Sequence, residues 1–197
     1  MVKQFINSVF NSNSYVIHND KDAILIDVGD FTPIQQYLDS QGLALRAVFI
    51  THTHYDHIYG VPELMQRYPH LPIYTSEFGK QAFGTPKWNF SRYHDQTICI
   101  ISDNIISLHH NDIISPCDDM KLRVLATPGH DESCLSFICG DSLFTGDSYI
   151  PGVKVIATFP RSDKELANVW YGKLAEISQS YDLYPGHGPA VITATDL

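Results

Sequence analysis

Residues 52–57 read His-Thr-His-Tyr-Asp-His, and this stretch decides how the rest of the sequence is interpreted. On an α-helix the side chains of His52 and His54 would point about 200° apart, so they could not share a ligand. In an extended chain alternate side chains project to one side, which places His52, His54 and Asp56 together. A turn within the stretch then brings His57 to a neighbouring point. The stretch therefore predicts three imidazoles and one carboxylate that converge.

Other candidate site residues each follow a short apolar run of the kind that forms a strand. They are Asp27 after residues 24–26, His130 after 125–129, Asp147 after 143–146, and His187 after 183–186. Glycine precedes three of them, as expected where a strand must turn sharply and present a side chain. Since ligands in α/β proteins collect at the carboxyl ends of strands, we expect these side chains to meet at one edge.

Composition and charge narrow the classes of function. The 197 residues correspond to one domain over residues 1–197. A formal net charge of −9 disfavours binding to nucleic acid and to anionic membrane surfaces. The N-terminal residues have no signal-peptide pattern, and no apolar run approaches the roughly 18 residues of a membrane span. We expect a cytoplasmic protein with reduced cysteines.

Short runs rich in β-branched and aromatic residues predict strands, with helical patterns between some of them. The predicted strands cover residues 15–17, 23–26, 47–51, 73–75, 122–126, 135–139 and 183–184. The clearest helix covers 162–178, where Ser162 and Glu165 match a capping box. Its predicted apolar stripe is Leu166, Val169, Trp170, Leu174 and Ile177. These elements predict either two sheets covered by outer helices or one mixed α/β sheet.

Four motifs resemble the metal motifs of the metallo-β-lactamase superfamily, and most closely those of its glyoxalase II-like branch. They read Thr-His-Thr-His-Tyr-Asp-His-Ile-Tyr-Gly over 51–60, Thr-Pro-Gly-His-Asp over 127–131, Phe-Thr-Gly-Asp-Ser over 144–148, and Tyr-Pro-Gly-His-Gly over 184–188. The resemblance implies an α/β (α+β) fold, an αββα four-layer sandwich of two mixed β-sheets flanked by helices. It covers nearly the whole chain.

The resemblance also implies two metal ions at one edge of the sandwich. It assigns His52, His54 and His130 to the first ion, Asp56, His57 and His187 to the second, and Asp147 to both as a bridge. Asp27 would orient a ligand histidine, so Asp56 and Asp27 are expected to act in catalysis. A donor set rich in imidazole, with carboxylates and no thiolate, suits Zn²⁺, with iron or manganese as alternatives.

Two such ions can share a hydroxide and lower its pKa toward neutrality, which predicts a hydrolase with a small-molecule substrate. A thioester is expected, because a thiolate leaves without a dedicated general acid. By resemblance, Asp147 argues against a β-lactamase, since those branches generally lack the bridging carboxylate. Two alternatives stay open: a persulfide dioxygenase-like oxidoreductase with one iron, and a metal-binding scaffold without catalysis.

Residues 83–97 have no clear periodicity and predict a long loop. Only ten residues follow His187, so we expect no C-terminal helical domain of the kind that carries part of the glutathione site in glyoxalase II. The loop would then supply substrate contacts through Trp88 and Arg92, with Arg161 as a further candidate. The alternative is that the aromatic residues of the loop only close the edge of the core.

Overall fold

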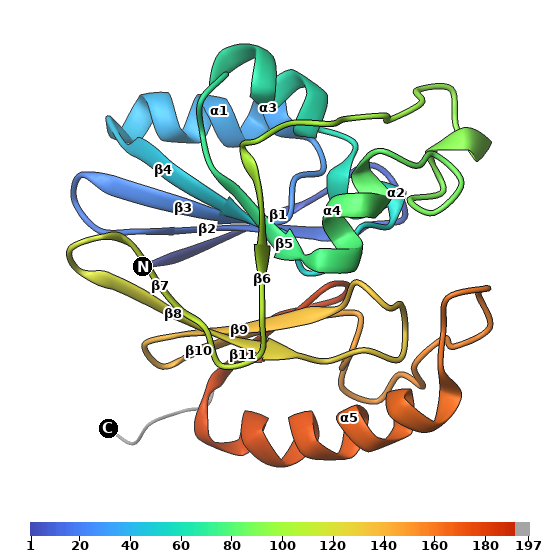
Figure 1. Cartoon of the computed structure of the whole chain (residues 1–197). Coiled ribbons are helices and arrows are strands. Elements are labelled where there is room, and N and C mark those ends of the chain that lie inside the picture. Colours follow the sequence, from blue (N-terminus) through green and yellow to red (C-terminus); the bar gives the residue numbers. More distant parts are fainter. Residues whose placement is uncertain (192–197) are drawn as a thin grey trace.

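The computed structural model describes residues 1–191, and its strands form two mixed sheets (Figure 1). The first sheet has the order β1 (Val2–Ile6), β2 (Asn13–His18), β3 (Asp22–Ile26), β4 (Ala44–Phe49), β5 (Ile73–Ser76) and β6 (Ile105–Leu108). The second has the order β11 (Asp182–Pro185), β10 (Ser142–Gly146), β9 (Leu135–Cys139), β8 (Met120–Ala126) and β7 (Ile113–Cys117). Strands β3 to β6 are parallel, as are β10 and β11.

Helices cover the outer faces of both sheets, which gives four layers (Figure 1). The first sheet is covered by α1 (Phe31–Gln41) and α3 (Val61–Arg67), and the second by α5 (Lys164–Ile177). The remaining helical segments are short: α2 (Tyr55–Ile58), α4 (Glu77–Phe83), η1 (Ser91–Tyr93) and η2 (Ser178–Ser180). This arrangement confirms the αββα sandwich and excludes the single mixed sheet.

Alternation along the strands explains why both faces of a sheet can be buried. In β3, Ala23 and Leu25 pack toward α1 and α3, whereas Ile24 and Ile26 pack into the core between the sheets. A continuous apolar run is therefore what a central strand of this sandwich requires. Among residues 1–191, no helix is long and apolar enough to span a bilayer.

The strands that the sequence does not predict are β1, β6 and β7, and all three lie at the edge of a sheet. Edge strands are covered on fewer sides, so their residues need not form an apolar run. Strand β1, for example, consists of half-buried and exposed residues and includes Lys3 and Gln4. The hydrophobic pattern identifies the interior strands and the edge strand β11, but not these three edge strands.

The last long helix lies where it is predicted, but its start and its buried face differ. Asp163 caps α5 by accepting hydrogen bonds from the N–H groups of Glu165 and Leu166, whereas the Ser162 hydroxyl donates to the carbonyl of His130. Leu166 and Val169 are exposed; the packed face consists of Ala167, Trp170, Leu174 and Ile177. The capping box and part of the stripe are therefore wrong, because a cap one residue later is available and the sheet contacts the other face.

Candidate metal centre

The predicted site residues lie at the carboxyl ends of five strands. Asp27 directly follows β3, Asp147 directly follows β10, and His187 lies just beyond β11. The stretch 52–57 begins three residues after β4, and His130 lies four residues after β8. Because β3 and β4 run in parallel, and β8, β10 and β11 share one direction, these ends meet at one edge of the sandwich.

The first group of candidate ligands consists of His52, His54 and His130, whose ligand atoms lie within 4.8 Å of one another. Nδ1 of His54 is 3.0 Å from Nε2 of His130. Hydrogen-bond partners hold the outer nitrogens: Nδ1 of His52 is 3.1 Å from the hydroxyl of Thr51, and Nδ1 of His130 is 2.8 Å from the carbonyl of Ile156. These contacts turn Nε2 of both rings toward the group.

The second group consists of Asp56, His57 and His187, also within 4.8 Å. One carboxylate oxygen of Asp56 is 3.3 Å from Nε2 of both histidines. Nδ1 of His187 is 3.2 Å from the carbonyl of Phe10, which fixes the ring from behind. All three residues therefore present one atom each to a common point.

Asp147 lies between the two groups. One of its oxygens is 3.6 Å from Nε2 of His57, and the other is 3.6 Å from Nε2 of His130 and 3.5 Å from Nε2 of His187. A Cβ added to Gly186 would lie 2.1 Å from the nearer Asp147 oxygen, so only glycine leaves room for this carboxylate. The placement is what a bridging ligand requires.

Asp27 supports the second group rather than joining it. Its carboxylate accepts hydrogen bonds from the N–H and the hydroxyl of Thr51, both at 2.7 Å, and contacts Nδ1 of His57 at 2.9 Å. Asp27 has a φ of 55°, a left-handed conformation that costs free energy for a residue other than glycine. The strand end thus holds Asp27 where it fixes the His57 ring.

Charge at the site favours a bound cation. Burial among other imidazoles lowers the pKa of His52 well below its usual value, which leaves that ligand neutral. Burial alone would raise the pKa of Asp147, but His187, His57 and His130 hold it at about 2. The carboxylates Asp56 and Asp147 in turn raise the pKa of His187 to about 9 despite its burial. Without metal, protons on imidazoles therefore offset the carboxylates, a role that a metal cation fills when it binds.

The unpartnered atoms of the site fit a metal as well. Nε2 of His52, Nε2 of His57 and one oxygen of Asp147 are buried without a hydrogen-bond partner in the described part of the chain, and they lie within 4.8 Å of one another. Buried polar atoms normally have partners, so these atoms call for a ligand that is not protein. The structure brings all seven predicted ligands together, and their individual roles stay predictions.

The family comparison agrees with this geometry. The family model of the metallo-beta-lactamase superfamily matches residues 7–189. The chain belongs to this superfamily. A probable metallo-hydrolase of Streptococcus pyogenes is 30% identical over 94% of this chain and 82% of its own length. The resemblance inferred from the four motifs is confirmed.

Two further proteins resemble this chain, one in sequence and one in structure. A hydroxyacylglutathione hydrolase of Xylella fastidiosa is 36% identical over 69% of this chain, but that match spans only 45% of the relative. The solved structure of the B3 metallo-beta-lactamase BLEG-1 superposes with a TM-score of 0.85 and 24% identity, covering 96% of this chain and 93% of that one. At 24% identity, the match to BLEG-1 establishes the fold alone.

The predicted substrate-binding residues take different positions around the centre. Trp88 and Arg161 line one pocket, and the Arg161 guanidinium lies 4.3 Å from the centroid of the Trp88 ring. Arg92 is exposed and lies over the Tyr93 ring instead. The side chain of this segment that packs on the metal centre is Phe90, whose ring centroid is 4.8 Å from that of His54.

Sequence reasoning also missed the carboxylate behind His54. One oxygen of Asp131 accepts hydrogen bonds from the N–H and the hydroxyl of Ser133, and the other is 3.5 Å from Nε2 of His54. Asp131 directs the His54 ring so that Nδ1, rather than Nε2, faces the group. The only sequence signal is its place after His130, which does not reveal that His54 lies against it.

Replacing Asp131 with asparagine is expected to weaken zinc binding about 10–100-fold, the usual effect of losing a partner that orients a ligand histidine. Competition against a chromophoric zinc chelator measures the affinity without an enzyme assay. The exposed Asp118, changed to asparagine, is the matched control. Equal zinc affinities for the two variants would show that Asp131 does not orient His54.

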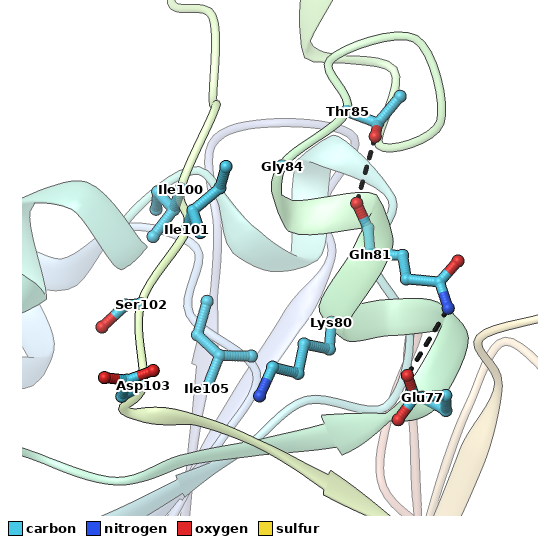
Figure 2. Close-up of a pocket in the computed structure, with 10 residues that line it drawn as sticks. All are labelled: Glu77, Lys80, Gln81, Gly84, Thr85, Ile100, Ile101, Ser102, Asp103 and Ile105. Carbon is cyan, nitrogen blue, oxygen red and sulfur yellow. Dashed lines mark hydrogen bonds between the residues drawn. The ribbon is translucent and has the colours of Figure 1, made fainter.

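A second hollow of this fold lies away from the centre. It runs between α4 and the segment 100–105, and Figure 2 shows its ten labelled residues, among them Lys80, Gln81 and Asp103. A hydrogen bond between Glu77 and Gln81 belongs to α4 itself. No predicted site residue lines this hollow, so we assign it no part in the chemistry.

Proposed function

We propose that this superfamily member is a dinuclear metal-dependent hydrolase that cleaves thioesters or similarly activated acyl compounds. The observation that carries the proposal is the position of Asp147, whose carboxylate lies beside His130 of the first group and beside His57 and His187 of the second. A scaffold that only stored a metal would need neither a second group nor a carboxylate between the two. The reaction would break the C–S bond, form a C–O bond with water, and release a carboxylic acid and a thiol.

The residues have distinct tasks in this proposal. His52, His54 and His130 would hold one ion, Asp56, His57 and His187 the other, and Asp147 both. Metal ions in such a pair supply Lewis acidity and make water nucleophilic near neutral pH. Asp27 keeps Nε2 of His57 turned inward. The rings of Phe90 and Phe159 pack against His54 and exclude bulk water from that side.

Two arguments favour a thioester. A thiol with a pKa of about 8.5 leaves as thiolate without a proton donor, and the rings of Phe90 and Phe159 beside the first group offer no proton. The Xylella relative, which this chain matches over 45% of its length, is named as a hydrolase of acylated glutathione. We propose Zn²⁺ as the metal because of the imidazole-rich donor set, with iron or manganese as alternatives.

Purified protein, prepared without added metal and then after loading with zinc, iron or manganese, is expected to bind up to two ions per chain. On a panel of a thioester, a lactone, a phosphodiester and a β-lactam, hydrolysis of the thioester is expected to be fastest. Elemental analysis and initial rates give the two results. Oxygen uptake with a persulfide substrate is measured in parallel.

Three outcomes would contradict the proposal. Faster cleavage of the phosphodiester or the β-lactam would assign another substrate class to the same centre. Oxygen uptake with one bound iron would assign a dioxygenase. Bound metal without turnover of any panel member would leave a scaffold.

A further inference from the structure

A pocket of about 240 Å³ lies next to the metal centre and shares one wall with it. Its lining residues are Lys87, Trp88, Phe90, Tyr93, Pro160 and Arg161. Pockets for drug-sized ligands have volumes of about 300–1,000 Å³, so this one has room for a single ring or a short branched chain. Three aromatic rings and a proline make it suited to an apolar group.

Phe90 connects the pocket to the metal centre. Its ring meets the His54 ring edge-on, with centroids 4.8 Å apart, and packs on Phe159 at 5.2 Å. Phe159 in turn contacts the rings of His54 and His130 at 5.1 and 5.8 Å. A group in the pocket is therefore separated from His54 by the Phe90 ring alone.

Phe90 is held in this position at a cost. Its φ of 61° is a left-handed conformation that a bulky residue rarely adopts. The fully buried side chain of Asn89 fixes the backbone there by donating to the carbonyls of Ala82 and Ile98, at 2.9 and 3.0 Å. Backbone strain of this kind clusters at sites that bind a ligand. It persists only where the surrounding structure holds the residue in place.

The Trp88 side of the pocket consists of stacked side chains. Trp88 is stacked on Phe78 with centroids 5.3 Å apart, and the Arg161 guanidinium covers the same indole at 4.3 Å. Arg161 also forms an ion pair with Glu132 at 3.2 Å, so its charge is already paired. Arg161 therefore forms part of the wall through its contact with the Trp88 ring. A preformed wall loses little conformational freedom when a ligand binds.

We propose that this pocket binds an aromatic or branched apolar group of the substrate, next to the bond that is cleaved. The inference rests on the proposed hydrolysis for its reaction, and it adds a substrate class: acyl compounds with one apolar ring or branch close to the carbonyl. The group could belong to the acyl half or to the thiol half of a thioester. The pocket chemistry is the same in both cases, so the experiment separates them.

The test compares two series of thioesters on the zinc-loaded protein. In one, N-acetylcysteamine carries acetyl or phenylacetyl; in the other, the acetyl group is carried by ethanethiol or benzyl mercaptan. We expect the ring to raise kcat/KM about 10–100-fold in one series, which identifies the half that enters the pocket. Phe90→Ala and, at an exposed position, Tyr93→Ala should each reduce that preference, mainly through KM. Trp170→Phe, on α5, is the control and should retain it.

A binding measurement tests the pocket without turnover. The chain has two tryptophans, so in the Trp170→Phe protein the fluorescence reports on Trp88 alone. Titration with benzyl alcohol should change this fluorescence saturably, and titration with methanol should not. Tyr93 is 67% exposed, so Tyr93→Ala is expected to fold and should weaken the saturable binding.

Several results would overturn the inference. One is thioester hydrolysis with no preference for a ring in either series. Another is an unchanged preference in both Phe90→Ala and Tyr93→Ala when their zinc content matches wild type. A change of the Trp88 fluorescence that does not saturate with benzyl alcohol would also overturn the inference. If no thioester is hydrolysed at all, the proposed function fails, and the fluorescence titration still decides on the pocket.

Discussion

Replacing Asp147 with alanine is expected to lower hydrolase activity by more than about 100-fold and to reduce the metal content from two ions toward one. The carboxylate faces both groups of ligands, and its removal takes a donor from each. Asp27→Ala should cost less, about 10–100-fold, because the one candidate ligand that Asp27 contacts is His57, at its outer nitrogen. Rates and elemental analysis on the same preparations measure both effects.

The exposed residue Asp20, changed to alanine, controls for the loss of a negative charge and should leave both quantities unchanged. The ranking of the two site variants is the informative result, since any damage to the fold would lower both. Equal and mild losses for Asp147→Ala and Asp27→Ala would argue that the centre is not dinuclear. A full metal content in Asp147→Ala would lead to the same conclusion.

The candidate ligands could be predicted from the sequence because each belongs to a local pattern. An apolar run followed by a turn and a polar residue is visible at Asp27, Asp147 and His187 without knowledge of the fold. In 52–57 the predicted alternation holds for His52 and His54, whereas Asp56 and His57 lie on the helical turn α2 and face the second group, which corrects the extended arrangement expected for Asp56. Parallel strands then bring these local patterns to one edge, so the sandwich adds proximity and does not change the residues involved.

What could not be predicted depends on packing between distant segments. Asp131 lies against His54 across 77 positions of the chain, and a backbone carbonyl at Ile156 holds His130. Carbonyls carry no sequence signal, and an aspartate beside a histidine motif is common on surfaces. Likewise, the loop 83–97 predicts aromatic contacts near the site, but the choice of Phe90 over Arg92 depends on the buried hydrogen bonds of Asn89.

Removing both metal ions with a chelator is expected to lower the melting temperature of the protein by about 15–30 °C. A ligand present at 1,000 times its Kd stabilises the folded state by about 4.1 kcal/mol per site. For a chain of about 200 residues, each kcal/mol shifts the melting temperature by about 2–4 °C. Calorimetry or a thermal-shift assay on the metal-loaded and chelated protein measures the difference.

The electrostatics of the centre give the reason for this loss and supply its control. Asp56 and Asp147 are mostly buried, and without a cation only imidazole protons offset their charges. Protonating these imidazoles costs free energy, because the charged rings are buried. A metal ion avoids this cost by binding the same nitrogens in place of the protons. In Asp147→Ala the chelator should therefore shift the melting temperature less than in wild type, because one carboxylate and the bridge are gone. If the chelator shifts the melting temperature of a preparation known to contain metal by less than about 1 °C, the ions do not occupy this buried centre and the proposed ligand set is wrong.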